Sequence, residues 1–290
     1  MARARREPRP VSLVSAAWLA AHAADSDVRI VDFRWYLGGK RGADEYLAGH
    51  VPGAVFVDLS EVTAPEGPGR HPLPAPSQLQ EAMQRAGVNI GDHVVVVDDA
   101  GGSIAARLWW LLREHGHARV SVLDGGLPAW SRAGHPLDTH IPTPPRGTFE
   151  AGAPHGRAVD KHAVATRDSA TLLLDVRAAE RYRGDLEPID ARPGHIPGAV
   201  NAPWSGNLGP EGTFASPDTL RARYRALGVT PDRPVIVSCG SGVTACHALL
   251  AFDVAGLPAP RLYEGSYSDW AADPSLSVDT GDVSSPTSCV

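Results

Sequence analysis

Short apolar segments rich in β-branched residues alternate with longer helical segments along this chain. Near-continuous apolar runs of this kind are typical of strands that are buried on both faces of a sheet. They lie at residues 28–32, 94–97, 120–123 and 235–238. Residues 104–112 and 245–252 stay apolar for long enough to form helices after two of these strands. The alternation predicts an α/β fold built on parallel sheets that carry helices on both faces.

The beginning of the chain allows two interpretations. Basic residues followed by the apolar stretch 11–24 resemble a secretory signal peptide. However, Trp18 and His22 interrupt that stretch, and Ser15 is a residue type that caps helix N-termini. Because the strand at 28–32 follows at once, we expect a capped first helix that opens a folded domain.

Three motifs occur twice and in the same order. The first copies lie at residues 30–34, 50–55 and 123–130, and the second copies at 173–177, 195–200 and 262–270. The offsets of 140 to 145 positions indicate duplication of one α/β domain. We predict a first domain over residues 11–140, a linker rich in proline and glycine over 141–157, a second domain over 158–282 and a tail over 283–290. The stretch after Pro274 has no apolar periodicity, so we expect it to fray.

Composition excludes several classes of function. The 290 residues suit two domains, and a net charge of −6 gives no basic surface for nucleic acid or anionic lipid. We find no segment with the length and apolarity of a membrane span. Cys239, Cys246 and Cys289 cannot form a disulfide framework, and a reactive thiol requires a reducing compartment, so we expect the cytoplasm. The twelve histidines show no metal-ligand spacing, and we predict no metal and no cofactor.

Cys239 has the setting of a nucleophile. It follows the strand at 235–238 and precedes the helix at 245–252, and Gly240 and Gly242 leave space above its sulfur. Backbone N–H groups of such a loop, together with the following helix N-terminus, stabilise an anion. A thiol placed there should ionise more easily than a free thiol, and the thiolate is the reactive form.

The segment Cys-Gly-Ser-Gly-Val-Thr at residues 239–244 resembles the active-site loop of the 3-mercaptopyruvate sulfurtransferases, within the two-domain rhodanese (thiosulfate sulfurtransferase) family. The resemblance implies two tandem rhodanese-like domains, each a parallel sheet with helices on both faces. It also implies an inactive first domain, because the repeat places Asp99 opposite Cys239. The implied activity moves sulfane sulfur from the small-molecule donor 3-mercaptopyruvate, through a persulfide on Cys239, to a thiol acceptor such as thioredoxin or to cyanide.

The resemblance assigns further residues to the site. Arg181, in Arg-Tyr-Arg-Gly, matches the arginine that binds the donor's carboxylate, and the loop residues Gly240, Gly242, Val243 and Thr244 would hold the donor and the persulfide. The second donor-binding arginine of the family lies in a loop that differs here, so Arg192 is assigned by position alone. His71 matches the histidine that crosses the domain cleft, and Ser241 would relay a proton between His71 and Cys239. Ser60 replaces the family's acidic partner, and Asp58 or Glu61 would have to substitute for it.

Other prominent residues are expected to be structural. His50 and His195 precede the same Pro-Gly-Ala turn in both halves, including the half without the nucleophile. The same argument covers two acid and arginine pairs, Asp32 with Arg34 and Asp175 with Arg177. Cys246 is expected to pack in the core, and Cys289 has no evident role.

Three alternative functions remain open on the sequence. Thiosulfate-preferring rhodaneses carry Cys-Arg-Lys-Gly-Val-Thr, whose two cations suit a dianionic donor, whereas Gly240 and Ser241 are neutral. Dual-specificity phosphatases resemble rhodaneses in fold, but their loop is longer and ends in an arginine where this chain has Thr244. A persulfide carrier that takes sulfur from a protein partner would share the same motifs.

Overall fold

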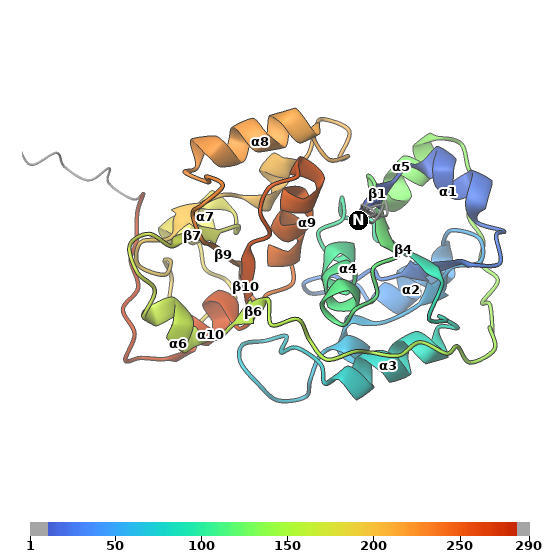
Figure 1. The fold of residues 1–290 in the computed structure, drawn as a ribbon, viewed down its shortest axis with the longest axis horizontal. Coiled ribbons are helices and arrows are strands. Elements are labelled where there is room, and N and C mark those ends of the chain that lie inside the picture. The colour runs from blue at the N-terminus through green and yellow to red at the C-terminus, as the bar shows by residue number, and fades with distance from the viewer. Residues whose placement is uncertain (1–10, 283–290) are drawn as a thin grey trace, which may run out of the picture.

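The computed structural model describes residues 11–282, which form two α/β domains lying side by side, the first at the right and the second at the left of Figure 1. The first sheet contains β1 (Leu13–Val14), β2 (Val28–Asp32), β3 (Val55–Phe56), β4 (His93–Val97) and β5 (Val120–Leu123). The second sheet contains β6 (Ala158–Val159), β7 (Leu172–Asp175), β8 (Val200–Asn201), β9 (Val235–Ser238) and β10 (Arg261–Tyr263). Their spatial orders, β1-β5-β4-β2-β3 and β6-β10-β9-β7-β8, are equivalent, and every pairing is parallel.

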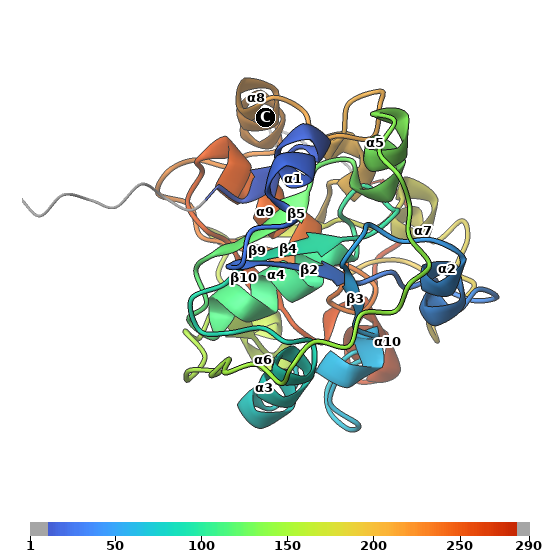
Figure 2. The same ribbon diagram turned by 90° about the vertical axis from the view of Figure 1, so that its right-hand side faces the viewer.

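Helices cover both faces of each sheet, which confirms the predicted architecture. The helices of the first domain are α1 (Ala16–His22), α2 (Gly42–Ala48), α3 (Pro76–Arg85), α4 (Ala105–Glu114) and α5 (Gly126–Arg132), with a 3₁₀ turn at Leu59–Val62. Figure 2 shows α1 and α5 on one side of this sheet and α3 and α4 on the other. The second domain repeats the plan with α6 (Lys161–Ala165), α7 (Ala179–Arg183), α8 (Pro217–Ala226), α9 (Ala245–Ala255) and α10 (Ser266–Ala272), and a 3₁₀ turn at Trp204–Asn207.

The first helix begins where its capping residue predicts. The Ser15 side chain accepts a hydrogen bond from the Trp18 N–H at 3.1 Å and so satisfies a donor at the helix N-terminus. Leu19 packs fully buried in the core between α1, α5 and the sheet. The expected opening helix is therefore confirmed.

The two domains share one apolar core. Helix α4 of the first domain packs against α9 of the second, and these helices lie next to each other at the centre of Figure 1. Buried residues of both sheets, such as Val96 and Val237, belong to one continuous cluster that runs through this contact. The carboxyl ends of β4 and β9, and the loops that follow them, are held at this boundary.

The segments outside the two sheets differ in part from expectation. Residues 133–157 contain no helix or strand, and they run along the first domain with Phe149 fully buried. The expectation that the chain frays after Pro274 is wrong for residues 274–282, because this stretch is tied to the second domain. Asp279 forms an isolated antiparallel bridge with His195, and the Gly281 N–H donates to the Arg183 carbonyl at 2.8 Å. The residues of the predicted tail at 283–290 lie outside the described part of the chain.

Candidate active site

Cys239 lies at the floor of the loop between β9 and α9. Its Sγ accepts a hydrogen bond from the Gly242 N–H at 3.1 Å, and the residue is only 1% exposed. Gly242 has a φ of 79°, and a Cβ at this position would clash with the Glu264 carbonyl oxygen. A glycine is therefore required to bring this amide onto the sulfur, where it favours negative charge.

A second turn, between β10 and α10, holds the Cys239 loop from below. The Cys239 N–H donates to Ser266 Oγ at 3.1 Å, and this hydroxyl lies 4.0 Å from the Cys239 sulfur. Ser266 has a φ of 50° and is the one non-glycine residue with positive φ in the described stretch 11–282. The corresponding position of the first domain, Gly126, has a φ of 57°. A serine where the other copy keeps glycine is a sequence signal that our motif comparison missed.

His71 reaches the second domain from the loop before α3. Its Nδ1 lies 2.8 Å from Ser241 Oγ, two residues after Cys239 in the chain. Burial lowers the pKa of His71 to about 4, with further lowering from the positive charges of Arg107 and Arg70, so the imidazole is neutral near pH 7. The structure therefore brings together Cys239, Ser241 and His71, the three residues that the motif comparison assigned to catalysis.

Neither acidic candidate completes a relay to His71. Asp58 caps the 3₁₀ turn at Leu59–Val62 and accepts from the Ser60 N–H at 2.9 Å, while Glu61 accepts from the Asp58 N–H at 2.8 Å and pairs with Arg85. Within residues 11–282, His71 has no hydrogen bond or ion pair with a carboxylate. The chain of hydrogen-bonded side chains that starts at Ser241 therefore ends at the His71 imidazole.

A pocket of about 230 Å³ opens above the loop. Its walls come from both domains and are formed by Trp35, Leu37, Arg70, Ile104, Arg177, Ala178, Arg181, Trp204, Gly240, Ser241, Val243 and Thr244. Three of the predicted donor-binding loop residues, Gly240, Val243 and Thr244, therefore face this space, and Gly242 lies beneath it on the cysteine sulfur. The pocket is large enough for a donor of a few heavy atoms.

Two guanidinium groups converge on Gly240 in this pocket. A Cβ on Gly240 would lie 2.9 Å from an Arg70 nitrogen and 3.5 Å from an Arg181 nitrogen. Both arginines pair with the buried carboxylate of Asp190, and Arg181 also donates to Glu187 at 2.7 Å. Arg181 thus occupies the predicted place beside the nucleophile. Arg70 comes from the first domain, and our motif comparison did not identify it.

The donor-binding role suggested for Arg192 is not supported by its contacts. Its guanidinium donates to the backbone carbonyls of Trp270, Ala271, Asp273 and Leu276 at 2.7 to 3.1 Å. It is not among the residues that line the pocket above Cys239. Arg192 therefore anchors the segment after α10 and lies outside the pocket that holds Arg181.

The equivalent loop of the first domain holds an anion of its own. The Asp98 carboxylate accepts four backbone hydrogen bonds at 2.9 to 3.1 Å, from the N–H groups of Ala100, Gly102, Ile104 and Ala105. Asp99, opposite Cys239 in the repeat, accepts from the Tyr36 hydroxyl instead. The Gly102 N–H therefore donates to a carboxylate of its own loop, whereas the equivalent Gly242 N–H of the second domain donates to the Cys239 sulfur.

The residues expected to be structural are engaged inside their own domains. His50 Nδ1 contacts the Tyr46 carbonyl and His195 Nδ1 the Tyr182 carbonyl, each at 2.8 Å and each with the rings stacked. The two acid and arginine pairs form buried ion pairs of 2.8 and 2.6 Å. Cys246 is fully buried in α9, and burial raises its pKa to about 12, so its thiol stays protonated. Cys289 lies outside the described residues.

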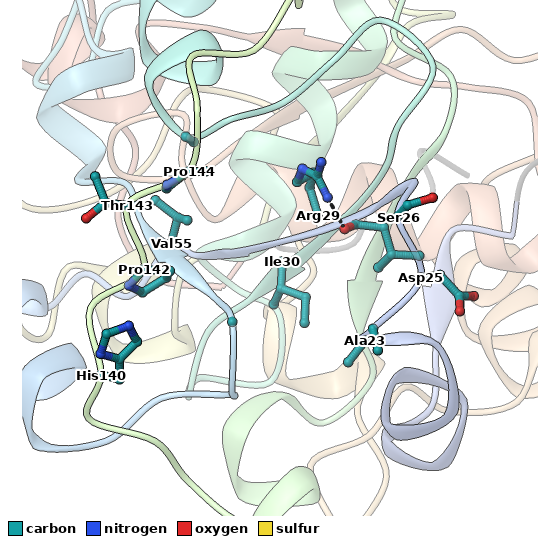
Figure 3. Close-up of a pocket in the computed structure, with 14 residues that line it drawn as sticks. Ala23, Asp25, Ser26, Arg29, Ile30, Val55, His140, Pro142, Thr143 and Pro144 are labelled. Carbon is teal, nitrogen blue, oxygen red and sulfur yellow. Dashed lines mark hydrogen bonds between the residues drawn. The ribbon is translucent and has the colours of Figure 1, made fainter.

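A larger hollow of about 540 Å³ lies elsewhere in the first domain, between the end of α1, β2 and the linker (Figure 3). The guanidinium of Arg29, which lines this hollow, donates to the Val28 carbonyl at 2.9 Å and to the Gly87 carbonyl at 3.0 Å. Its lining includes no cysteine. Across residues 11–282 we also find no cluster of three potential metal ligands and no helix suited to spanning a bilayer.

Both halves of the chain match the model of the Rhodanese-like domain, over residues 15–133 and 159–273. This chain belongs to the rhodanese family. It is 40% identical over 274 residues to a 3-mercaptopyruvate sulfurtransferase of Escherichia coli strain K12. The alignment covers 92% of this chain and 97% of that relative. A thiosulfate sulfurtransferase of Rattus norvegicus is 36% identical over 284 residues, or 93% and 96% of the two chains.

A solved structure gives the same picture. The crystal structure of SseA from Escherichia coli, described as a 3-mercaptopyruvate sulfotransferase, superposes with a TM-score of 0.78 at 38% identity. The match covers 89% of this chain and 99% of SseA. The rhodanese fold with two domains, and a sulfurtransferase activity, follow from these matches together.

Proposed function

We propose that this rhodanese is a sulfurtransferase that takes sulfur from 3-mercaptopyruvate and passes it to a thiol through a persulfide on Cys239. The observation that carries the proposal is the position of the Cys239 sulfur. It accepts the Gly242 N–H, and the next two loop residues, Gly240 and Ser241, line a pocket that also holds Arg181. Ser241 Oγ lies 2.8 Å from His71 Nδ1. A nucleophile, an anion anchor and a proton-handling pair are thus within one small space.

The first half-reaction uses the Cys239 thiolate. It attacks the donor's sulfur, an S–S bond forms, and the C–S bond breaks with its electron pair leaving on carbon as the enolate of pyruvate. The proton of the donor's thiol passes by way of Ser241 and His71 to the enolate, which leaves as pyruvate, and the persulfide left as an anion on Cys239 accepts hydrogen bonds from the loop amides. A thiolate acceptor then attacks the outer sulfur, and the Cys239 thiolate is released.

The anchor for the donor's carboxylate is the pair formed by Arg181 and Arg70. A guanidinium binds a carboxylate through two parallel hydrogen bonds, and both groups already pair with the buried Asp190 carboxylate. Thiosulfate is the second candidate donor, because two guanidinium groups beside Gly240 also suit a dianion. Since the loop itself adds no cation and Asp190 offsets part of the positive charge, we favour the monoanionic 3-mercaptopyruvate.

The acceptor and the compartment are also part of the proposal. Within the described residues Cys239 and Cys246 are free thiols, which fits a reducing compartment such as the cytoplasm. A small protein dithiol such as thioredoxin would remove the outer sulfur there by thiol exchange.

Intact mass spectrometry tests the proposal. Incubation with 3-mercaptopyruvate should add one sulfur, about 32 Da, as the product of covalent catalysis. Cys239→Ala should show no gain, while Cys246→Ala should keep it. We expect a higher kcat/KM with 3-mercaptopyruvate than with thiosulfate. A clear preference for thiosulfate would overturn the choice of donor, and an unchanged mass with both donors would overturn the persulfide itself.

A further inference from the structure

Arg107 in α4 links the two loops that carry the chemistry. Its side chain is fully buried, and it comes from the first domain. One terminal nitrogen donates to the Gly242 carbonyl at 3.3 Å and the other to the His71 carbonyl at 3.0 Å. The residue that places an amide on the cysteine sulfur and the residue that faces Ser241 are therefore held by one guanidinium.

This cation is buried without a paired carboxylate. Within residues 11–282 no acid lies in ion-pair contact with Arg107, and its Nε has no hydrogen-bond partner. Burying a charge without a counter-charge is costly, so such an arrangement calls for an anion nearby. Cys246 is protonated, and burial raises the pKa of Glu264, the other acidic group that faces Arg107. Glu264 is not in ion-pair contact with Arg107, whereas Cys239 belongs to the loop that Arg107 binds, because its Sγ accepts the N–H of the same Gly242 whose carbonyl accepts from Arg107.

The repeat supplies an internal comparison. The position equivalent to Arg107 in the second domain is His247, which lies in α9 and points into the loop of the first domain. Its Nε2 contacts the Gly101 carbonyl at 3.2 Å, and burial lowers its pKa to about 3, so it is neutral. The first loop already holds the Asp98 carboxylate on its own amides. A side chain of each helix therefore contacts the loop of the other domain. The neutral His247 contacts the first loop, and the positively charged Arg107 contacts the loop that carries Cys239.

We propose that Arg107 is a positioning residue for sulfur transfer, contributed by the inactive domain. It fixes Gly242 and His71 around the sulfur and supplies the buried positive charge that the Cys239 thiolate and its persulfide balance. The inference rests on the proposed function for its role in turnover. Its claim about the reactivity of Cys239 stands independently of any sulfur donor.

Alkylation of Cys239 by iodoacetamide tests the electrostatic part. The reagent is small and neutral, and peptide mapping assigns the modified cysteine. The charged and titratable groups around the sulfur are Arg70 and His71 before α3, Arg181 on α7, Cys246 on α9 and Glu264 after β10. All of them are unchanged in the variants compared, so a difference between pH profiles reports on residue 107.

Arg107→Met should slow alkylation of Cys239 at pH 7 by about tenfold or more and move its pH midpoint upward, since a buried positive charge is lost. Arg107→Lys keeps the charge, but its compact ammonium cannot reproduce the planar fork on two carbonyls. It should retain most of the alkylation rate and lose kcat with little change in KM. Arg113→Met is the matched control, because Arg113 lies on the same helix and contacts Asp253 of the second domain at 3.1 Å, in a separate pocket.

Stability separates this role from a merely structural one. Replacing an unpaired buried cation with an apolar side chain of similar length should leave the thermal midpoint unchanged or raise it. Wild-type alkylation kinetics in folded Arg107→Met would overturn the inference. If Arg107→Met does not fold, Arg107→Gln, which removes the charge, is compared with Arg107→Lys, which keeps it. Equal alkylation rates of Cys239 in these two variants would also overturn the inference. If the wild-type protein is alkylated at Cys239 but forms no persulfide with either donor, that result counts against the proposed function and not against the role of Arg107.

Discussion

His71 is a neutral base at physiological pH because of where it is buried. Its ring lies between the Trp35 ring and Ser241, and two arginines add positive charge nearby. As an uncharged imidazole, such a group has a free ring nitrogen that can accept a proton through Ser241. Protonating it would place a third positive charge beside Arg70 and Arg107.

We predict that His71 titrates near pH 4. NMR of the protein labelled at histidine ring carbons should show one resonance with this midpoint, assigned by its loss in His71→Asn. Arg70→Met should raise the pKa of His71, because Arg70 contributes to lowering it. A midpoint near 6.5 in the wild type, the ordinary value for histidine, would contradict the burial argument.

At the level of residues, the sequence predicts those site residues that lie close together along the chain. Cys239 and Ser241 belong to one loop, and a motif comparison finds them. Arg107 contributes through a contact 135 positions away, between helices of different domains, and no spacing in the sequence predicts it. Arg192 shows the opposite error, because its position in a loop resembled a donor site while its target carbonyls lie about 80 positions further along.

Two equivalent loops differ in how they satisfy their amides. In the first domain the loop from β4 to α4 closes around the Asp98 carboxylate, and in the second the equivalent residue is Ser238. The Ser238 hydroxyl makes only a long contact of 3.5 Å with the Cys239 carbonyl. The first loop therefore donates its N–H groups to a carboxylate of its own chain, and in the second loop the Gly242 N–H donates to the Cys239 sulfur.

We predict a large stability difference between alanine substitutions at these two positions. Asp98→Ala leaves four N–H groups without an acceptor, three of them in buried hydrogen bonds, and should lower the free energy of unfolding by about 3 kcal/mol or more. Ser238→Ala should cost less than about 1 kcal/mol, because little hydrogen bonding is lost. Urea denaturation of the three proteins measures both values. Equal losses for the two variants would show that the Asp98 contacts do not hold the loop.

The elements that the sequence predicts are those long enough to show a pattern. The predicted strands at 28–32 and 235–238 coincide with β2 and β9, and the helix after Cys239 is α9. The two-residue strands β1, β3, β6 and β8 are too short for any periodicity, and they form because a longer parallel strand lies beside them. Similarly, residues 274–282 lack an apolar pattern and are ordered by backbone contacts.

For the molecule as a whole, the first domain contributes side chains to the proposed site in the second. It contributes His71, Arg70 and Arg107 to the space above and below the Cys239 loop. The shared core between α4 and α9 holds these groups in register with the loop. If the proposed site is correct, the second copy uses side chains of the first, which gives a physical reason to keep a copy that has Asp99 in place of the nucleophile.

The domain boundary should also determine how stability depends on pH. His247 is buried there against the Phe214 ring, in contact with the Gly101 carbonyl and the Asn207 side chain. Because burial lowers its pKa from 6.5 to about 3, the unfolded chain binds a proton between these values that the folded chain does not. The contribution of His247 to stability is therefore complete above pH 6.5 and is lost progressively as the pH falls toward 3.

We predict that His247→Asn flattens this dependence. Between pH 5.5 and 4 the wild type should lose about 1.4 kcal/mol more per pH unit than the variant, which corresponds to one proton. Urea denaturation at several pH values in this range gives both slopes, and their difference removes the contribution of the carboxylates common to both proteins. The variant has lower stability at pH 7, since it loses ring packing, so the two curves should approach each other on acidification. Parallel curves would mean that His247 is protonated in the folded protein as readily as in the unfolded chain.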